Sequence, residues 1–211
     1  MNMGYERSFF FDHVRRNPFS GRLASGQVAG LAAVLEAWEA RNPIEGPAAL
    51  AYALATAFHE TAATMQPVRE TLAKTDQLAV VRLESAYSAG RLRTVKTPYW
   101  RYDADGRTWL GRGLVQLTHR RNYQKMSALT GIDLVTAPHR AMEMDVAVKI
   151  LIEGMRAGSF TGRKLGDYFG PGKSDWVGAR KIINGNDRAA RVAGYAKAFA
   201  AALRDDAAMA A

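Results

Sequence analysis

The longest mostly apolar run in this sequence covers residues 48–58 (AALAYALATAF) and ends directly at His59 and Glu60. A helix needs about 20 apolar residues to span a bilayer, so a run of this length indicates a helix buried in a protein core. The helix is expected to start near Pro47 and must end before Pro67. The pattern therefore predicts a buried helix that carries Glu60 near its C-terminal end.

Apolar residues recur at helical spacing along most of the remaining chain. In the segment 25–41 they fall on one face, with Ser25 as the expected N-cap and Pro43 as a stop. With 48% hydrophobic and 23% charged residues, the 211-residue chain has the composition of a globular protein, and we expect one mostly α domain. Further helices are expected at residues 119–130 (closed by Gly131), 141–157 (closed by Gly158), 175–183 and 188–204 (capped by Asp187).

One segment departs from the helical pattern. Residues 97–113 (TPYWRYDADGRTWLGRG) place aromatic and threonine residues on either side of Asp105 and Gly106. An Asp-Gly pair between such runs is a strong signal for a tight turn between two strands. This segment therefore predicts a small β-hairpin within a smaller lobe of about residues 88–113.

Cysteine is absent from the sequence. Disulfides, thiolate zinc sites and a cysteine nucleophile are therefore excluded, and packing must stabilise the fold. The N-terminal segment combines Glu6, Arg7 and Asp12 with a short aromatic cluster, unlike the uninterrupted apolar stretch of a secretory signal. We expect synthesis in the cytosol, without a signal peptide.

Positive charge is concentrated in one part of the chain. The formal net charge is +9, and residues 91–125 contribute nine basic and two acidic residues. A basic surface implies a polyanionic partner, and nucleic acid, an acidic membrane or an anionic cell-wall polymer would satisfy it equally. The nine basic residues are Arg91, Arg93, Lys96, Arg101, Arg107, Arg112, Arg120, Arg121 and Lys125.

Two glutamates, Glu60 and Glu70, occur in the segment FHETAATMQPVRE. Such a pair can perform general acid and base catalysis, although two glutamates this close in sequence are more often solvated surface residues. Glu60 is less ordinary, because it follows a nearly all-apolar helix and faces the negative end of the helix dipole. Both circumstances favour the neutral carboxyl group that a general acid needs.

The sequence segments that resemble metal-binding and nucleotide-binding motifs each lack a required residue. The zinc-protease motif HExxH would need histidine where the chain has Ala63, and the four histidines have no ligand-like spacing. GPGKS at residues 170–174 resembles the end of a phosphate loop, but Asp167 occupies the position of the first glycine. A turn capped by Ser174 explains this segment better. We expect neither a metal ion nor a cofactor.

The segment GRGLVQLTHRRNY, at residues 111–123, is more informative. Its glycines allow a tight backbone, and a helix starting here would place Thr118 and Asn122 on one face. A simple N-cap role for Thr118 is an equally good interpretation, and the two roles can coexist.

Four blocks, taken in order from about residue 52 to 199, resemble the glycoside hydrolase family 19 lysozyme-like enzymes, specifically the phage-type endolysins. They are FHETAATMQPVRE, GRGLVQLTHRRNY, KIING and RVAGYAKAF. The resemblance implies that Glu60 is the general acid, that Glu70 is the base that activates water, and that Thr118 helps to hold this water. It implies sugar contacts from Gln116, Asn122 and Asn184, and an electrostatic role for Arg191, with Arg188 as the alternative.

The resemblance also implies a fold and a reaction. We expect a mostly α, lysozyme-like bilobed helical domain, in which a small β-hairpin subdomain flanks a substrate groove. Residues 1–211 would form a single catalytic domain without a separate cell-wall-binding module. The implied reaction is inverting hydrolysis of β-1,4 glycosidic bonds by two carboxylates. Plant chitinases of the family have disulfides, and an aromatic residue where this chain has Arg121, so we expect peptidoglycan glycan strands as the substrate.

The implied biological role is that of a bacteriophage endolysin, an antimicrobial lysozyme that causes cytolysis through cell-wall catabolism. We expect a monomer that stays in the host cytoplasm until its release to the periplasm and cell wall, with a holin as a candidate release partner. Nucleic acid and stable membrane insertion are not expected. The alternatives are a chitinase of the same family, and a basic helical protein that binds nucleic acid or membranes. Muramidase and glucosaminidase cleavage both stay open.

Aromatic residues surround the expected hairpin. Aromatic faces pack well against the apolar face of a pyranose, so we expect at least one of these rings to line the sugar groove. The rings are Tyr99, Trp100, Tyr102 and Trp109, with Trp100 and Tyr102 as the selected candidates. The alternative is that all of them fill the core of the smaller lobe.

Overall fold

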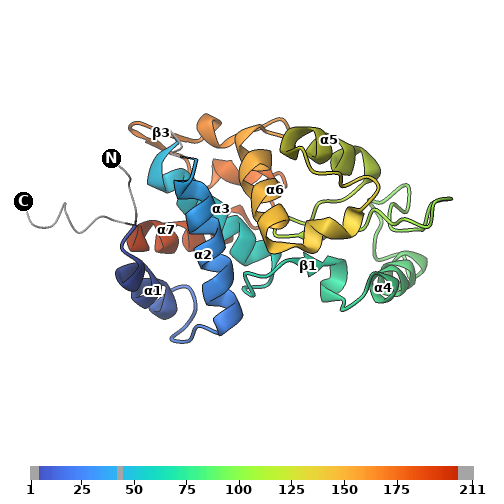
Figure 1. The fold of residues 1–211 in the computed structure, drawn as a ribbon, viewed down its shortest axis with the longest axis horizontal. Coiled ribbons are helices and arrows are strands. Elements are labelled where there is room, and N and C mark those ends of the chain that lie inside the picture. The colour runs from blue at the N-terminus through green and yellow to red at the C-terminus, as the bar shows by residue number, and fades with distance from the viewer. Residues whose placement is uncertain (1–4, 42–44, 204–211) are drawn as a thin grey trace, which may run out of the picture.

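The computed structural model describes residues 5–41 and 45–203, and this part of the chain is mostly helical (Figure 1). The expected mostly α fold is therefore confirmed. Its α-helices are α1 (Arg7–Arg16), α2 (Ser25–Glu39), α3 (Gly46–Glu60), α4 (Asp76–Ser88), α5 (Arg120–Thr130), α6 (Met144–Arg156) and α7 (Ala189–Ala202). Short 3-10 helices cover Glu70–Leu72, Pro138–Met142, Leu165–Asp167 and Gly178–Ile182, and two-residue strands are β1 (Val68–Arg69), β2 (Arg112–Gly113), β3 (Phe169–Gly170) and β4 (Lys173–Ser174).

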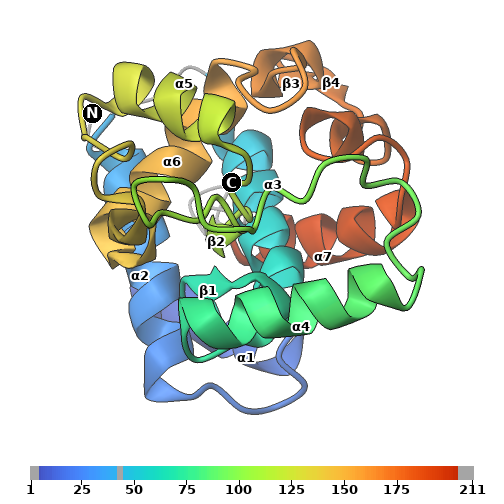
Figure 2. The same cartoon turned by 90° about the vertical axis from the view of Figure 1, so that its right-hand side faces the viewer.

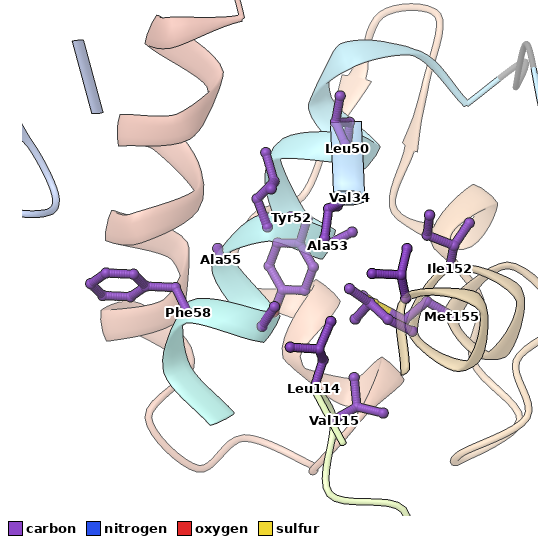
Figure 3. Close-up of a cluster of buried hydrophobic side chains, with 14 of the residues drawn as sticks. Val34, Leu50, Tyr52, Ala53, Ala55, Phe58, Leu114, Val115, Ile152 and Met155 are labelled. Atoms are coloured by element: carbon purple, nitrogen blue, oxygen red, sulfur yellow. The ribbon is translucent and has the colours of Figure 1, made fainter. Parts of the chain in front are cut away.

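Helix α3 is the centre of the fold, as the apolar run predicts. Every residue from 49 to 58 is buried, and α7, α6 and α2 pack against the helix (Figure 2). Side chains leave α3 in several directions to meet the rest of the core (Figure 3). The Phe58 ring, for example, packs edge-on against Tyr195 and Phe199 of α7, with centroid separations of 4.7 and 6.0 Å. A helix that is apolar all round is stable only in such a position.

The other predicted helices differ from the observed ones mainly at their ends. Helices α2, α5, α6 and α7 fall within the predicted segments, and Gly131, with a φ of 71°, ends α5 as expected. Arg188 rather than Asp187 is the N-cap of α7, and Ser25 is the first helical residue rather than the cap of α2. Pro43 and residue 204 lie outside the described residues.

The segment 175–183 forms only the 3-10 helix Gly178–Ile182. The Asp175 carboxylate accepts a hydrogen bond from the Gly178 N–H and stabilises a local turn instead of a longer α-helix. Asp175 thus has the capping role expected of Ser174, which lies in β4. Gly172 has a φ of 69° in the tight turn that joins β3 to β4.

The hairpin expected around Asp105 and Gly106 is absent as a strand pair. The chain does reverse there, and the Asp103 N–H donates to the Arg107 carbonyl over 2.8 Å, but neither flanking segment is a strand. The Asp103 carboxylate accepts hydrogen bonds from the N–H groups of Asp105 and Arg107, so a side chain satisfies donors that a strand partner would otherwise satisfy.

A second hydrophobic cluster, separate from the core around α3, lies beneath α4. Its buried members are Ala73, Ala79, Leu83, Trp100 and Leu110. This cluster combines residues of α4, which the sequence pattern did not reveal, with residues of the segment 88–113. Only Ala79 and Leu83 of α4 are buried, so the helix lacks a broad apolar face. Helix α1 was missed as well, although Glu6 caps its first turn.

The strand pair β1–β2 joins the two clusters. In its antiparallel register Arg69 lies opposite Arg112, an arrangement in which like charges repel. The Asp76 carboxylate accepts from Arg69 Nε at 2.6 Å and from Arg112 Nη2 at 2.7 Å, and so bridges them. Burial raises the pKa of Asp76, but the hydrogen bonds and charges of the two arginines outweigh this effect and hold the pKa below its usual range.

Replacing Asp76 with asparagine should destabilise the protein. Arg112 is almost fully buried and would lose its anionic partner, so we expect the free energy of unfolding at pH 7 to fall by about 3 kcal/mol. The pKa of Asp76 is lowered in the folded state. Its contribution is therefore complete above the unfolded value of about 3.9 and disappears as the pH falls through the folded value. Denaturant unfolding at a series of pH values should show that the free energy of unfolding falls less steeply with decreasing pH in Asp76→Asn than in the wild type.

Asp105→Asn is the matched control, because Asp105 is exposed and lies 3.5 Å from Arg107. Its free energy of unfolding should change by less than about 0.5 kcal/mol. An equal decrease in the free energy of unfolding in Asp76→Asn and Asp105→Asn would contradict the bridging role of Asp76.

Candidate active site

Five of the residues selected from the sequence line one pocket of about 280 Å³. Four different segments supply them: the end of α3, the loop that follows β2, the first turn of α5, and the chain after the 3-10 helix Gly178–Ile182. Val115, Leu117, Phe160 and Ile183 form its apolar walls. The five polar residues are Glu60, Gln116, Thr118, Asn122 and Asn184.

Glu60 is the last residue of α3, and its partner is an arginine that the sequence did not single out. Arg180 Nη1 lies 2.7 Å from Glu60 Oε1, and the Arg180 side chain is only 3% exposed. Arg180 Nε donates to the Asp187 carbonyl, which fixes the guanidinium. This ion pair holds one carboxylate oxygen of Glu60 at the pocket wall.

Arg191, the predicted electrostatic residue, is exposed and makes no ion pair with Glu60 within the described residues. The charge of Arg191 does act on the neighbouring His59. Burial lowers the pKa of His59, and the negative charge of Glu60 opposes this. The positive charges of Arg180, Arg188 and Arg191 lower the pKa of His59 further. Arg180, rather than Arg191, is therefore the arginine that pairs with Glu60. Its position directly before KIING was a usable signal in the sequence.

Glu70 directly follows β1, and hydrogen bonds hold both of its carboxylate oxygens. Tyr99 Oη donates to Oε1 at 2.7 Å, and the Gly111 N–H donates to Oε2 at 2.8 Å. The Glu70 N–H in turn donates to the Gly111 carbonyl. Burial and the negative charge of Glu70 raise the pKa of Tyr99, so the phenol stays protonated and keeps donating.

Gly111 is the point at which three candidate residues converge. A Cβ atom there would lie 2.7 Å from Gln116 Oε1, 3.3 Å from Glu70 Oε2 and 3.3 Å from Thr118 Cγ2. Thr118 therefore lines the pocket that contains Glu60 and also lies near Glu70. Gln116 is further fixed by a hydrogen bond from its Nε2 to the Val68 carbonyl.

Strained backbone is concentrated in the same region. Among the described non-glycine residues, most of those with positive φ lie between the two glutamates, directly after Glu70, or beside Thr118. Such conformations cost of order 1–3 kcal/mol each and cluster at functional sites. These residues are Ala62, Ala63, Met65, Thr71, Leu72, Gln116 and His119.

The N-cap interpretation of Thr118 is wrong. The N-cap of α5 is His119, and no side chain caps this helix. The Thr118 carbonyl instead accepts a hydrogen bond from Asn122 Nδ2 at 2.8 Å, which links two residues of the pocket wall.

The aromatic candidates lie elsewhere. Trp100 is fully buried in the second cluster, and its Nε1 donates to Glu84, so the prediction that it lines the groove is wrong. Tyr102 is exposed but does not line the pocket. Tyr99, which holds Glu70, packs its ring against His119 with a centroid separation of 4.2 Å.

The basic stretch is less uniformly exposed than the charge count implies. Arg112 is buried and paired with Asp76, Arg101 pairs with Glu84, and Arg107 pairs with Asp105. The exposed cations of the stretch that form no ion pair within the described residues are Arg91, Arg93, Lys96, Arg120, Arg121 and Lys125.

Over residues 5–41 and 45–203, no three His, Asp or Glu side chains come together as a group that could hold a metal ion. In the same part of the chain, no helix has both the length and the apolar character that crossing a membrane requires. No protein-family model matches this chain, and no curated protein is significantly similar to it in sequence.

Replacing Gly111 with alanine should disturb the convergence of Glu70 and Gln116. The added methyl group would lie 2.7 Å from Gln116 Oε1, so we expect the free energy of unfolding to fall by about 1–3 kcal/mol. A crystal structure of the variant should show displaced side chains at both residues. Gly194→Ala is the control, because Gly194 is exposed on α7 and an added Cβ has no neighbour within 4 Å. It should stabilise the protein by about 0.5–1 kcal/mol. An unchanged Glu70 in Gly111→Ala would contradict the argument.

Proposed function

We propose that this protein is a glycoside hydrolase of the family 19 lysozyme-like type, and that it hydrolyses β-1,4 glycosidic bonds of peptidoglycan. The observation that carries the proposal is one pocket that combines Glu60 with Gln116, Thr118 and two asparagines, and that adjoins the firmly held Glu70 through Thr118. Amide and hydroxyl groups suit the hydroxyl and acetamido groups of a sugar, and two carboxylates suit acid and base roles.

Glu60 acts as the general acid in this proposal. Arg180 donates to Glu60 Oε1, which leaves Oε2 to carry the proton toward the leaving glycosidic oxygen. A neutral carboxyl group can keep the same hydrogen bond, because its carbonyl oxygen still accepts from the guanidinium. Arg180 would thus orient the acid during donation and stabilise the carboxylate that forms afterwards.

Glu70 acts as the base. Tyr99 and the Gly111 N–H fix its two oxygens, and the remaining lone pairs can accept a proton from a water held with Thr118. The two carboxylates have separate hydrogen-bond partners, and Thr118 lies in the surroundings of both. This arrangement supports a single displacement. An inverting enzyme separates its carboxyl groups by roughly 6.5–9.5 Å to admit water, whereas a retaining enzyme keeps them about 5–5.5 Å apart.

The two hydrophobic clusters support a lysozyme-like bilobed architecture, with the strand pair β1–β2 between the lobes. As parts of the same proposal, the protein acts as a monomeric phage endolysin. It is made in the host cytoplasm and released to the wall, with a holin as the candidate release partner.

Conservative variants of the two carboxylates test the proposed reaction. Glu60→Gln loses the proton donor and Glu70→Gln loses the water activator, so each should lower kcat on purified peptidoglycan by about a thousandfold or more with unchanged folding. Glu36→Gln, at an exposed position of α2, is the matched control and should retain full activity. NMR of the first-formed product should show the α-anomer, because inversion at a β-linkage releases it.

Several outcomes of this experiment would contradict the proposal. A β-anomer would overturn the inverting mechanism, and cleavage of chitin without cleavage of peptidoglycan would favour the chitinase alternative. A protein that binds nucleic acid or membranes and cleaves neither polymer would belong to the binding class. Mass spectrometry of the new reducing ends separates muramidase from glucosaminidase cleavage.

Variants of Arg180 and Arg191 can show which of the two arginines has the electrostatic role in catalysis. Arg180→Gln should lower kcat about a hundredfold, because it removes the charge beside Glu60. Arg191→Gln should change kcat by less than about fivefold, as expected for an exposed charge. Arg180→Lys keeps the charge and should recover part of the activity, which separates electrostatics from misfolding. A larger loss in Arg191→Gln than in Arg180→Gln would restore the assignment made from the sequence.

A further inference from the structure

A second pocket, of about 420 Å³, adjoins the pocket that contains Glu60. Asn122 and Phe160 line both pockets, so a molecule bound beside Glu60 lies next to the second pocket. Its volume falls within the usual range of ligand pockets, about 300–1,000 Å³. Its remaining lining residues are Arg121, Lys125, Ser159, Thr161 and Gly162.

Hydrogen bonds fix the loop that forms one wall of this pocket. Lys125 Nζ, on α5, donates to the Ser159 carbonyl at 2.9 Å. On the other side of the loop, Thr161 Oγ1 donates to the Lys181 carbonyl at 2.6 Å. The loop is therefore held between α5 and the 3-10 helix that carries Arg180.

The Phe160 ring packs directly on the backbone of α6. A Cβ atom at Gly154 would lie 2.5 Å from this ring, so the glycine is what allows the contact. Phe160 thus forms a fixed partition shared by the two pockets.

The second pocket is positively charged. Arg121 and Lys125 lie four residues apart on α5, and therefore on the same face of the helix. No acidic side chain lines the pocket, and neither cation forms an ion pair within the described residues. Burial is the main cause of the lowered pKa of His119, and the charge of Arg121 lowers it further.

We propose that Arg121 and Lys125 form a subsite for a carboxylate of the peptide that is attached to the sugar bound beside Glu60. The inference rests on the proposed function. The pyranose rings of a glycan backbone are uncharged, so an anion in the neighbouring pocket must come from a branch of the bound sugar. In peptidoglycan the branch is a peptide with free carboxylates, whereas chitin has none. The subsite would therefore select for peptide-bearing strands.

Cleavage kinetics can separate this subsite from a general basic surface. The substrates are peptide-bearing peptidoglycan strands and N-acetylglucosamine oligomers, which carry no carboxylate. Arg121→Gln and Lys125→Gln should each raise KM for the peptide-bearing strands about fivefold, and leave the oligomers within twofold of the wild type. Arg93→Gln, which removes an equal charge from an exposed position outside both pockets, should leave KM for both substrates within twofold.

A binding measurement makes the test independent of turnover. A soluble N-acetylmuramyl peptide titrated into the ¹⁵N-labelled protein should shift the amide signals of residues 121–125 and 159–162. The same peptide with amidated carboxyl groups should shift them much less, and Arg121→Gln should weaken the binding.

The outcomes distinguish the two proposals. If the wild-type protein cleaves no glycan but binds the peptide at these amides, the proposed function fails and the carboxylate subsite stands. If glycan is cleaved and Arg121→Gln behaves like Arg93→Gln, the subsite is overturned while the hydrolase stands. An equal rise in KM for both substrates in Arg121→Gln would mean that Arg121 contacts the sugar backbone, which also overturns the carboxylate subsite.

Discussion

The carboxylate of Asp76 lies between two guanidinium groups that face each other across the β1–β2 pair. Without this anion, Arg69 and Arg112 would repel at the junction between the two hydrophobic clusters. Glu70 directly follows β1 and Gly111 directly precedes β2, so the same ion pairs determine where the candidate base meets its backbone donor. A charge on α4 thereby contributes to the geometry of the candidate site.

The two candidate carboxylates occupy different surroundings, and this difference matters for their chemistry. Glu60 lies at the end of the most buried helix and faces a nearly buried arginine, while Glu70 accepts hydrogen bonds from a phenol and a backbone amide. An acid and a base need different environments when both residues are glutamates. Thr118 lines the pocket with Glu60 and lies near Glu70 around Gly111.

The elements that could be predicted from sequence are those with a strong local signal. The apolar run before Glu60 predicts α3, and apolar periodicity with a terminal glycine predicts α5. Helix α4 was missed because it buries only two residues, and its position depends on Asp76 and on Trp100, far along the chain. The hairpin prediction at Asp105 failed because the Asp103 carboxylate satisfies the backbone donors locally.

The sequence by itself determined the helical core, because this depends on residue type and on spacing over a few turns. The polar residues that line the pocket were selected through the resemblance of four sequence blocks to a known family. Only the tertiary structure decided that Arg180 rather than Arg191 pairs with Glu60, that Tyr99 holds Glu70, and that Trp100 lies inside a core. Each of these contacts joins residues about 30 or more positions apart, or depends on which side of a packed cluster a ring occupies. Local propensity carries no information about either, because long-range packing sets both.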